Sequence, residues 1–240
     1  MKNMLILGSE GFLGKAVQKY FNGRYNLICL DQHIVADSDN RYQKNNVFIS
    51  KFNINDKDSY KNILDFLESN QVKIDIIVNL IGVNSFKNFY SVSREDWNNT
   101  LDTNLSSFVF LLKELYFYFN NQVSIVAIAS QNGVVAHENR IDYGTSKAAL
   151  IHLVKNLTID FLLDKEKDIK INCISPTYIQ NESNKEYFNG IEGKKLLRKI
   201  PYRKILEYDD VVNAIEFLIS DKSKGIRGQN IIIDYGYTLI

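Results

Sequence analysis

Met4-Leu5-Ile6-Leu7-Gly8-Ser9-Glu10-Gly11-Phe12-Leu13-Gly14 is the stretch that decides the fold of this chain. Its first four residues form a short apolar run, which is typical of a strand buried on both faces of a parallel sheet. Glycines follow at every third position, and a helical pattern then continues through Tyr20. Glycine permits a tight turn and lets the backbone approach a pyrophosphate, which the N-terminus of the following helix stabilises. The stretch therefore predicts a strand, a phosphate-binding turn and a helix at the start of an α/β domain.

Apolar runs alternate with amphipathic patterns along the rest of the chain. The further predicted strands are Asn26–Leu30, Val47–Phe52, Ile74–Val78, Val123–Ala129, Ile169–Ile174 and a closing strand within residues 228–236. Helical periodicity covers Asp56–Asn70, Glu95–Phe119, Tyr143–Leu163 and Asp209–Ser220. Because such crossovers are right-handed, the alternation predicts a Rossmann-type, doubly wound parallel sheet of about seven strands with helices on both faces. Ligands of such sheets bind in the crevice at the carboxyl ends of the strands.

Length and composition favour one cytoplasmic domain spanning residues 1–240. The net charge is +1 with basic and acidic residues mixed, whereas binding to nucleic acid needs a concentrated basic face. No apolar run approaches the ~20 residues of a membrane span, and the first apolar run is too short for a signal peptide. Cys29 and Cys173 have no metal-ligand spacing, and the three histidines are scattered, so we expect free buried thiols and no metal site.

A phenol and an ammonium group are paired in the second half of the chain. Tyr143 and Lys147 are four residues apart in a helical pattern, so both side chains lie on one face. An ammonium beside a phenol favours the phenolate and lowers the pKa of the tyrosine towards the range of a general acid/base. Ser130 precedes them by thirteen residues, directly after a predicted strand, and Asn104 lies within the long helical pattern.

Together with the glycine turn, these residues resemble the short-chain dehydrogenase/reductase family in its compact single-domain branch, over essentially the whole chain. The resemblance implies that Tyr143 is the general acid/base and that Lys147 holds the cofactor ribose and tunes Tyr143. It also implies that Ser130 binds the substrate oxygen, although a serine there can instead cap a turn. Asn104 is expected to bend its helix and to hold a water molecule that links Lys147 to solvent.

The same resemblance implies a nicotinamide cofactor. The glycine spacing differs from the usual spacing of the compact branch and is similar to that of the extended branch, whose members act on nucleotide sugars. The residues expected to bind the cofactor are Gly8, Ser9, Glu10, Gly11, Phe12, Leu13, Gly14, Asp31, Asn53, Ile54, Asn79, Leu80, Ile81, Gly82, Tyr143, Lys147, Pro176, Thr177, Tyr178 and Ile179.

Several of these residues have a more specific expected role. Asn53 replaces the aspartate that contacts adenine in the family, and Thr177 replaces a glycine next to the nicotinamide amide. Asn79 is expected to tie neighbouring strands together, and Gly82 to leave space beside the nicotinamide ribose.

Two acidic residues favour NAD over NADP. Asp31 ends the second strand, where a carboxylate accepts hydrogen bonds from the adenosine ribose and repels a 2′-phosphate, and Glu10 adds a second negative charge. Two alternatives stay open. Asp31 can be a plain turn residue, and Lys15 or Arg41 can fold back onto a 2′-phosphate.

The expected reaction is reversible hydride transfer between the nicotinamide and a carbonyl or secondary alcohol. A substrate lid is expected at about residues 180–204. The polar approach to the site suits a hydroxylated or charged substrate, and it is formed by Gln131, Asn132, His137, Asn139 and Arg140. The basic second half of the lid is either a solvated surface or a contact for an anionic substrate.

Two other functions and one assembly state complete the expectations. One alternative is an epimerase- or dehydratase-like enzyme that uses NAD without net turnover, and another is a dinucleotide-sensing protein without catalysis. The helical stretches around Asn104 and Lys147 are rich in large apolar residues. Since the family pairs these helices between subunits, a homodimer or homotetramer is expected.

Overall fold

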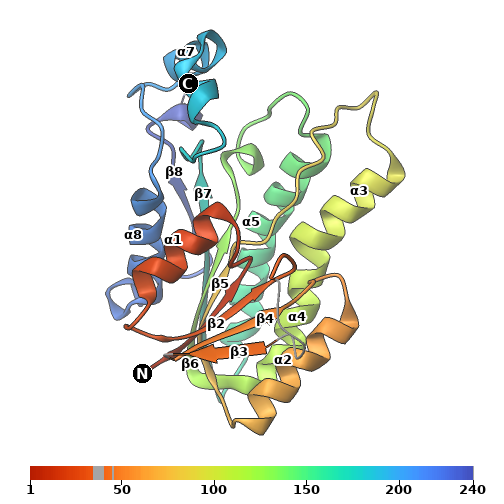
Figure 1. The fold of residues 1–240 in the computed structure, drawn as a ribbon, viewed down its shortest axis with the longest axis vertical. Helices are drawn as coiled ribbons and strands as arrows, with labels where there is room; N and C mark the ends of the chain where they lie inside the picture. The colour runs from red at the N-terminus through yellow and green to blue at the C-terminus, as the bar shows by residue number, and fades with distance from the viewer. Residues whose placement is uncertain (35–40, 45, 240) are drawn as a thin grey trace.

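The computed structural model describes residues 1–34, 41–44 and 46–239, and one parallel sheet organises them (Figure 1). In this described part, the strand order is β3-β4-β2-β1-β5-β6-β7-β8. Seven strands run parallel, which confirms the predicted doubly wound sheet, and β3 pairs antiparallel with β4 at one edge. The strands are β1 (Asn3–Leu7), β2 (Asn26–Asp31), β3 (Arg41–Lys44), β4 (Val47–Lys51), β5 (Ile74–Asn79), β6 (Phe119–Ile128), β7 (Asp168–Pro176) and β8 (Asn230–Ile233).

Helices cover both faces of the sheet, as predicted (Figure 1). On one face, α1 and α8 close a core around Met4, Val17 and Ile215. On the other face, α2, α4 and α5 close a second core around Leu5, Ile63 and Phe108. The helices are α1 (Phe12–Phe21), α2 (Lys57–Ser69), α3 (Arg94–Leu101), α4 (Ser107–Leu115), α5 (Ile141–Leu162), α6 (Lys185–Asn189), α7 (Ile191–Arg198) and α8 (Tyr208–Ile219).

The predicted long helix over 95–119 is wrong in detail. It is interrupted by a π-helical turn at Asp102–Ser106, and a short 3-10 turn at Tyr116–Tyr118 ends it. Phe119 already belongs to β6, which therefore begins earlier than predicted. Single π turns inside α-helices are frequent at functional sites. This one contains Asn104, the residue expected to bend the helix.

The expected lid contains two short helices, α6 and α7, above the carboxyl ends of the strands (Figure 1). Gly193 allows them to pack closely, because a Cβ there would lie 2.2 Å from the Tyr187 carbonyl oxygen. At the base of this segment, Ile179 and Leu206 form a parallel bridge. Both ends of the segment are thereby held against the body of the domain.

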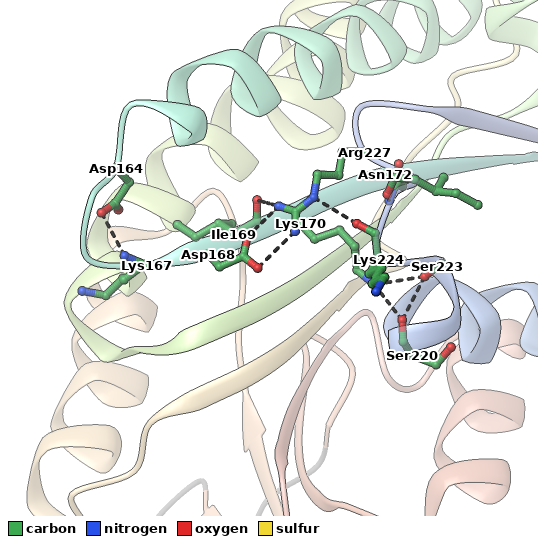
Figure 2. A network of polar contacts seen from close by, with 11 residues as sticks. Asp164, Lys167, Asp168, Ile169, Lys170, Asn172, Ser220, Ser223, Lys224 and Arg227 are labelled. Atoms are coloured by element: carbon green, nitrogen blue, oxygen red, sulfur yellow. Dashed lines mark hydrogen bonds and ion pairs between the residues drawn. The ribbon is translucent and has the colours of Figure 1, made fainter.

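The opposite edge of the sheet is closed by a polar network around Lys170 (Figure 2). The Lys170 side chain is buried, and its Nζ donates hydrogen bonds to the Ser220 carbonyl oxygen (2.8 Å) and to the Ser223 Oγ (3.0 Å). Arg227 forms an ion pair with Asp168 at 2.6 Å. This network joins the start of β7 to the segment after α8, away from the carboxyl ends where ligands bind.

Candidate active site

The glycine turn between β1 and α1 forms a tight cradle. Gly8 has a φ of +81°, which favours glycine, and the amides of Gly8 and Ser9 both donate to the Leu30 carbonyl oxygen. A Cβ at Gly14 would lie 2.3 Å from the Gly8 carbonyl oxygen, so only glycine lets α1 pack this closely. Gly11 caps α1 without a side-chain hydrogen bond, and the amides of the first helical turn are therefore available to an anion.

A cleft of about 690 Å³ opens beside this turn, within the usual range for a small-molecule or cofactor site. Its lining contains nine of the residues expected to bind the cofactor: Gly8, Glu10, Gly11, Asp31, Asn53, Ile54, Leu80, Ile81 and Gly82. Lys15, named above as a possible phosphate contact, lines the cleft as well, and the sequence prediction missed seven others: Gln32, His33, Phe52, Asn55, Val83, Asn99 and Thr103. Because the turn, the helix N-terminus and the cleft are continuous, the site fits a dinucleotide.

The other predicted cofactor residues lie outside this lining. Phe12, Leu13 and Gly14 belong to the first turn of α1, and Ser9 is fully buried beneath the glycine turn. The Ser9 Oγ is buried without a hydrogen-bond partner. The Asn79 side chain accepts from the amide of Ile81 at 3.1 Å. This bond fixes its own turn, whereas the sequence prediction gave Asn79 the role of tying strands together.

Asp31 is 7% exposed and joins two loops at the rim of the cleft. One carboxylate oxygen accepts from the amide of Glu10 at 3.0 Å, and the other accepts from the amide of His33 at 2.8 Å. Each oxygen retains capacity for a further hydrogen bond. Asp31 is therefore more than a turn residue, because its charge is held in a fixed position at the cleft. Glu10 forms an ion pair with Lys15 at 3.5 Å in the same cleft.

The next two cofactor residues along the cleft are Asn53 and Ile54, which follow β4. The Asn53 Oδ1 accepts from the amide of Asn55 at 3.0 Å, so this oxygen stabilises a local turn. The side-chain nitrogen of Asn53, Nδ2, remains the group that can donate a hydrogen bond to a ligand.

Asn104 connects three elements at the far end of the cleft. Its Oδ1 accepts from the Val83 amide at 2.8 Å, and its Nδ2 donates to the Val83 carbonyl oxygen at 2.9 Å. Nδ2 also donates to the Ser146 Oγ at 2.9 Å, which joins the π turn to α5. Ser146 is a contributor that the sequence analysis missed. No motif marked it, because its role depends on a contact between distant segments.

Lys147 lies on α5 with its ammonium group enclosed. The side chain is 3% exposed, and its Nζ donates to the Ile128 carbonyl oxygen at 2.8 Å. Burial lowers the pKa of Lys147 to about 8, because a charged amine is costly away from water. A Cβ at Gly82 would lie 3.0 Å from Nζ. The missing side chain of Gly82 therefore leaves room for the ammonium group itself.

Tyr143 lies one helical turn before Lys147, and the lysine Nζ is 5.7 Å from the centre of its ring. Burial raises the pKa of Tyr143, while a hydrogen bond with Ser130 and the charge of Arg140 lower it. The pKa of Tyr143 is therefore raised overall by burial, whereas the sequence analysis expected Lys147 to lower it. The Ser130 hydroxyl also accepts from the Asn132 amide at 3.1 Å, so Ser130 both caps a turn and faces Tyr143.

The segment Pro176–Ile179 leaves the carboxyl end of β7. Thr177 is buried, and its hydroxyl donates to the Gln131 Oε1 at 2.6 Å. The Tyr178 hydroxyl lies 3.0 Å from the His137 Nε2, and its ring packs edge-on against Phe188 of the lid. The side chain of Tyr178 therefore contacts the loop before α5 and the lid.

Comparisons with known proteins agree with this geometry. A family profile described as enoyl-(acyl carrier protein) reductase matches residues 28–238. A 3-oxoacyl-(acyl-carrier-protein) reductase from Buchnera aphidicola subsp. Schizaphis graminum is 30% identical over 199 residues, covering 82% of this chain and 80% of the relative. The chain belongs to the short-chain dehydrogenase/reductase family. It is therefore an NAD(P)-dependent oxidoreductase, as the sequence analysis predicted.

Two further relatives extend the match to the whole chain. An NAD-dependent glycerol dehydrogenase from Listeria innocua serovar 6a is 27% identical over 243 residues, covering 99% of this chain and 94% of the relative. The solved structure of a 4-hydroxyisoleucine dehydrogenase complexed with NADH has a TM-score of 0.89 at 27% identity and covers 100% of both chains. These relatives are named dehydrogenases and reductases, which favours net hydride transfer over the alternatives.

Three further expectations concern the cysteines, a metal site and a membrane-spanning segment. Cys29 and Cys173 are buried free thiols, and burial raises the pKa of each to about 12. No cluster of His, Cys, Asp and Glu suited to a metal ion occurs among the described residues. None of the described helices is long and apolar enough to cross a membrane.

Proposed function

We propose that this protein reversibly reduces a carbonyl group on a polar substrate, and that Tyr143, Ser130, Lys147 and Asn104 form its catalytic group. The observation that carries the proposal is the convergence of three side chains beside the cleft. Tyr143 is hydrogen-bonded to Ser130, and the buried Lys147 ammonium lies 5.7 Å from its ring. These residues come from the end of β6 and the first turns of α5, where ligands of such sheets bind.

Each residue has a defined task in the proposed reaction. Ser130 donates a hydrogen bond to the substrate oxygen, and Tyr143 gives that oxygen its proton in reduction or takes it in oxidation. A nicotinamide cofactor supplies or accepts the hydride when bound. Lys147 holds its ribose, and the π turn at Asn104 holds the water molecule that connects Lys147 with solvent. The remaining predicted cofactor residues would line or support the dinucleotide, from the glycine turn to Pro176–Ile179.

A spectroscopic assay tests this function. The protein is mixed with NADH or NADPH and a panel of hydroxylated and acidic ketones, and the loss of reduced nicotinamide is followed by absorbance. Net conversion is expected. Turnover of nucleotide sugars without net conversion would instead support the epimerase-like function that the glycine spacing suggests. Cofactor binding without any turnover would support a sensing protein and contradict catalysis.

We propose NAD as the preferred cofactor. The fixed carboxylate of Asp31 at the rim of the cleft supports this, since it suits a free ribose hydroxyl better than a 2′-phosphate. Glu10 adds negative charge, although Lys15 is paired with it. The side chain of Arg41 lies outside the described residues.

We also propose a homodimer or homotetramer built on α4 and α5. Large apolar side chains on and after these helices are exposed, which supports pairing between identical faces. The residues with their exposed fractions are Phe110 (59%), Phe117 (76%), Ile159 (63%), Leu162 (77%) and Leu163 (76%). Light scattering at micromolar concentration is expected to report a multimer that Phe110→Glu dissociates. A monomer in the unmodified protein would contradict the proposal.

Finally, we propose that residues 1–240 act as one cytoplasmic domain and that residues of about 180–204 form its substrate lid. The position of α6 and α7 above the carboxyl ends of the strands supports the lid (Figure 1). Limited proteolysis with and without cofactor and substrate tests it, with protection of this segment expected on binding.

A further inference from the structure

Arg140 is the residue immediately before α5, three positions ahead of Tyr143. Its carbonyl oxygen accepts from the Gly144 amide at 2.7 Å, which starts the helix and fixes the backbone of Arg140 relative to Tyr143. The direction in which the side chain leaves is therefore set by the same helical turn that carries the proposed acid/base.

The guanidinium group of Arg140 is only partly satisfied. Nη1 donates to the neighbouring Asn139 carbonyl oxygen at 2.8 Å, and Nε is buried without a hydrogen-bond partner. The ion pairs formed among the described residues do not include Arg140. An arginine has five N–H donors and a permanent charge, so a buried donor without a partner is costly. The contrast is Arg227, whose guanidinium makes two hydrogen bonds to the Asp168 carboxylate (Figure 2).

The guanidinium is nevertheless held in place. It lies over the ring of Phe86, with 4.3 Å between the arginine Cζ and the ring centre. Phe86 has a φ of +58° and Asn139 a φ of +55°, so these two neighbours of the guanidinium group have left-handed backbone conformations. Such conformations are uncommon for non-glycine residues, and for phenylalanine more than for asparagine. The Asn84 Oδ1 supports the Phe86 turn by accepting from its amide at 3.0 Å.

Arg140 also lies close to the proposed acid/base, because residues three positions apart at the start of a helix lie on one face. Its charge lowers the pKa of Tyr143, in which burial is the larger and opposing influence, and it acts in the same direction on Tyr178. Tyr143 lies on α5, and Tyr178 lies in the segment after β7. A cation that affects both tyrosines lies near Tyr143, where Arg140 lines a hollow formed by the loop before α5.

From these contacts we infer that Arg140 binds an acidic group of the substrate, a carboxylate in the simplest case, while Phe86 holds the guanidinium in position. The inference rests on the proposed function and narrows its substrate to oxo acids and hydroxy acids. A carboxylate matches the planar N–H fork of arginine and would supply the missing partner. Lys195 of the lid is a weaker source of such binding, because it already pairs with Glu192 at 2.7 Å and both are exposed.

A binding measurement tests Arg140 without depending on turnover. Calorimetric titration of the protein with NADH present uses acetate, malonate, succinate and glutarate, with their methyl esters as neutral probes. At least one acid is expected to bind, and its affinity is expected to fall about tenfold or more in Arg140→Gln. Arg140→Lys keeps the charge but loses the fork, so an intermediate affinity is expected. Arg227→Gln is the control, since it removes an equal charge at the opposite edge of the sheet.

The outcomes separate the two proposals. Failure of every acid to bind, or equal affinity in Arg140→Gln, overturns the role of Arg140 whatever the activity. Turnover is measured separately with oxo acids and their esters. If acids bind through Arg140 but neither acids nor esters are reduced, the anion site stands and the proposed function fails. If esters are reduced as well as acids, with the same kcat/KM in Arg140→Gln, the function stands and the substrate class is wrong.

Discussion

Gly82 leaves the space that the ammonium group of Lys147 fills, since a Cβ at position 82 would lie 3.0 Å from the lysine Nζ. The same Cβ would lie 3.5 Å from the Asn104 Oδ1. Because Gly82 has no side chain, the turn after β5 leaves the room in which the buried ammonium group of Lys147 lies.

Gly82→Ala tests this relationship. Alanine suits the backbone at this position, so the fold is expected to persist while Nζ shifts by a few tenths of an ångström. Since small misplacements in an active site are costly, kcat is expected to fall roughly tenfold with little change in Tm. Gly225→Ala is the control, because a Cβ there would meet nothing within 4 Å. Unchanged kcat in Gly82→Ala would show that the position of Nζ is not critical.

Tyr143→Phe tests the assignment of the acid/base. Only one hydroxyl group is lost, so the fold and cofactor affinity are expected to stay near those of the unmodified protein. The rate is expected to fall by about 10²–10⁴-fold, which is the usual contribution of general acid/base catalysis. Steady-state kinetics with cofactor binding measured in parallel separates the two effects. Near-normal turnover by this variant would remove Tyr143 from the mechanism.

The lowered pKa of Lys147 predicts that the free energy of unfolding rises with pH. Its folded pKa is about 8 against an ordinary value of 10.5, so between these values the unfolded chain binds more protons than the folded protein. Stability then rises with pH across this window, and the cost of burying the charge is fully present below pH 8. At about 1.4 kcal/mol per pH unit, the gain between pH 7 and 9 is expected to be about 1 kcal/mol.

Comparing the unmodified protein with Lys147→Met isolates this contribution. Met removes the titration, and its free energy of unfolding is expected to lack the rise between pH 7 and 9. Above pH 9, Cys29 and Cys173, with pKa values raised to about 12, lower the stability of both proteins, so the two are compared between pH 7 and 9. Chemical denaturation at several pH values measures the difference. Parallel curves for the two proteins would mean that Lys147 keeps an ordinary pKa.

The elements that the sequence predicted well are those with local signals. The apolar run of β1, the glycines after it and the amphipathic pattern of α1 each act within a few neighbouring residues. The polar edge strand Arg41–Lys44 has no such pattern, because it forms by antiparallel pairing with β4. The end of α4 was misjudged because the aromatic run Tyr116–Phe119 continues the helical spacing while the chain turns into β6.

The proposed catalytic group could be chosen from the sequence as a set of residues, but the pKa shifts of its members could not be predicted. The spacing of Tyr143 and Lys147 placed them on one helix face, whereas the degree of burial that raises one pKa and lowers the other depends on the whole domain. Arg140 was predictable only as a polar residue near the site. That its Nε has no partner depends on how the loop carrying Phe86 packs against the start of α5.

Comparing the affinities for NADH and NADPH tests the proposed role of Asp31 most directly. A 2′-phosphate at the rim of the cleft would meet the Asp31 carboxylate, which two backbone amides hold in place, and the nearby charge of Glu10. We expect NADH to bind at least about tenfold more tightly than NADPH, a difference of about 1.4 kcal/mol. In Asp31→Ser combined with Gln32→Arg, the repulsion is removed and a phosphate partner is supplied, so the preference is expected to shrink or reverse. Asp31→Asn is the matched control, since it removes the charge but keeps the size and one acceptor oxygen for the loop amides.

The opposing influence is Lys15, which lines the cleft 3.5 Å from Glu10 and can turn to a phosphate. Titration of both cofactors by intrinsic fluorescence, with Lys15→Gln beside the unmodified protein, separates the two residues. Equal or tighter NADPH binding by the unmodified protein that disappears in Lys15→Gln would show that Lys15, and not Asp31, decides the cofactor.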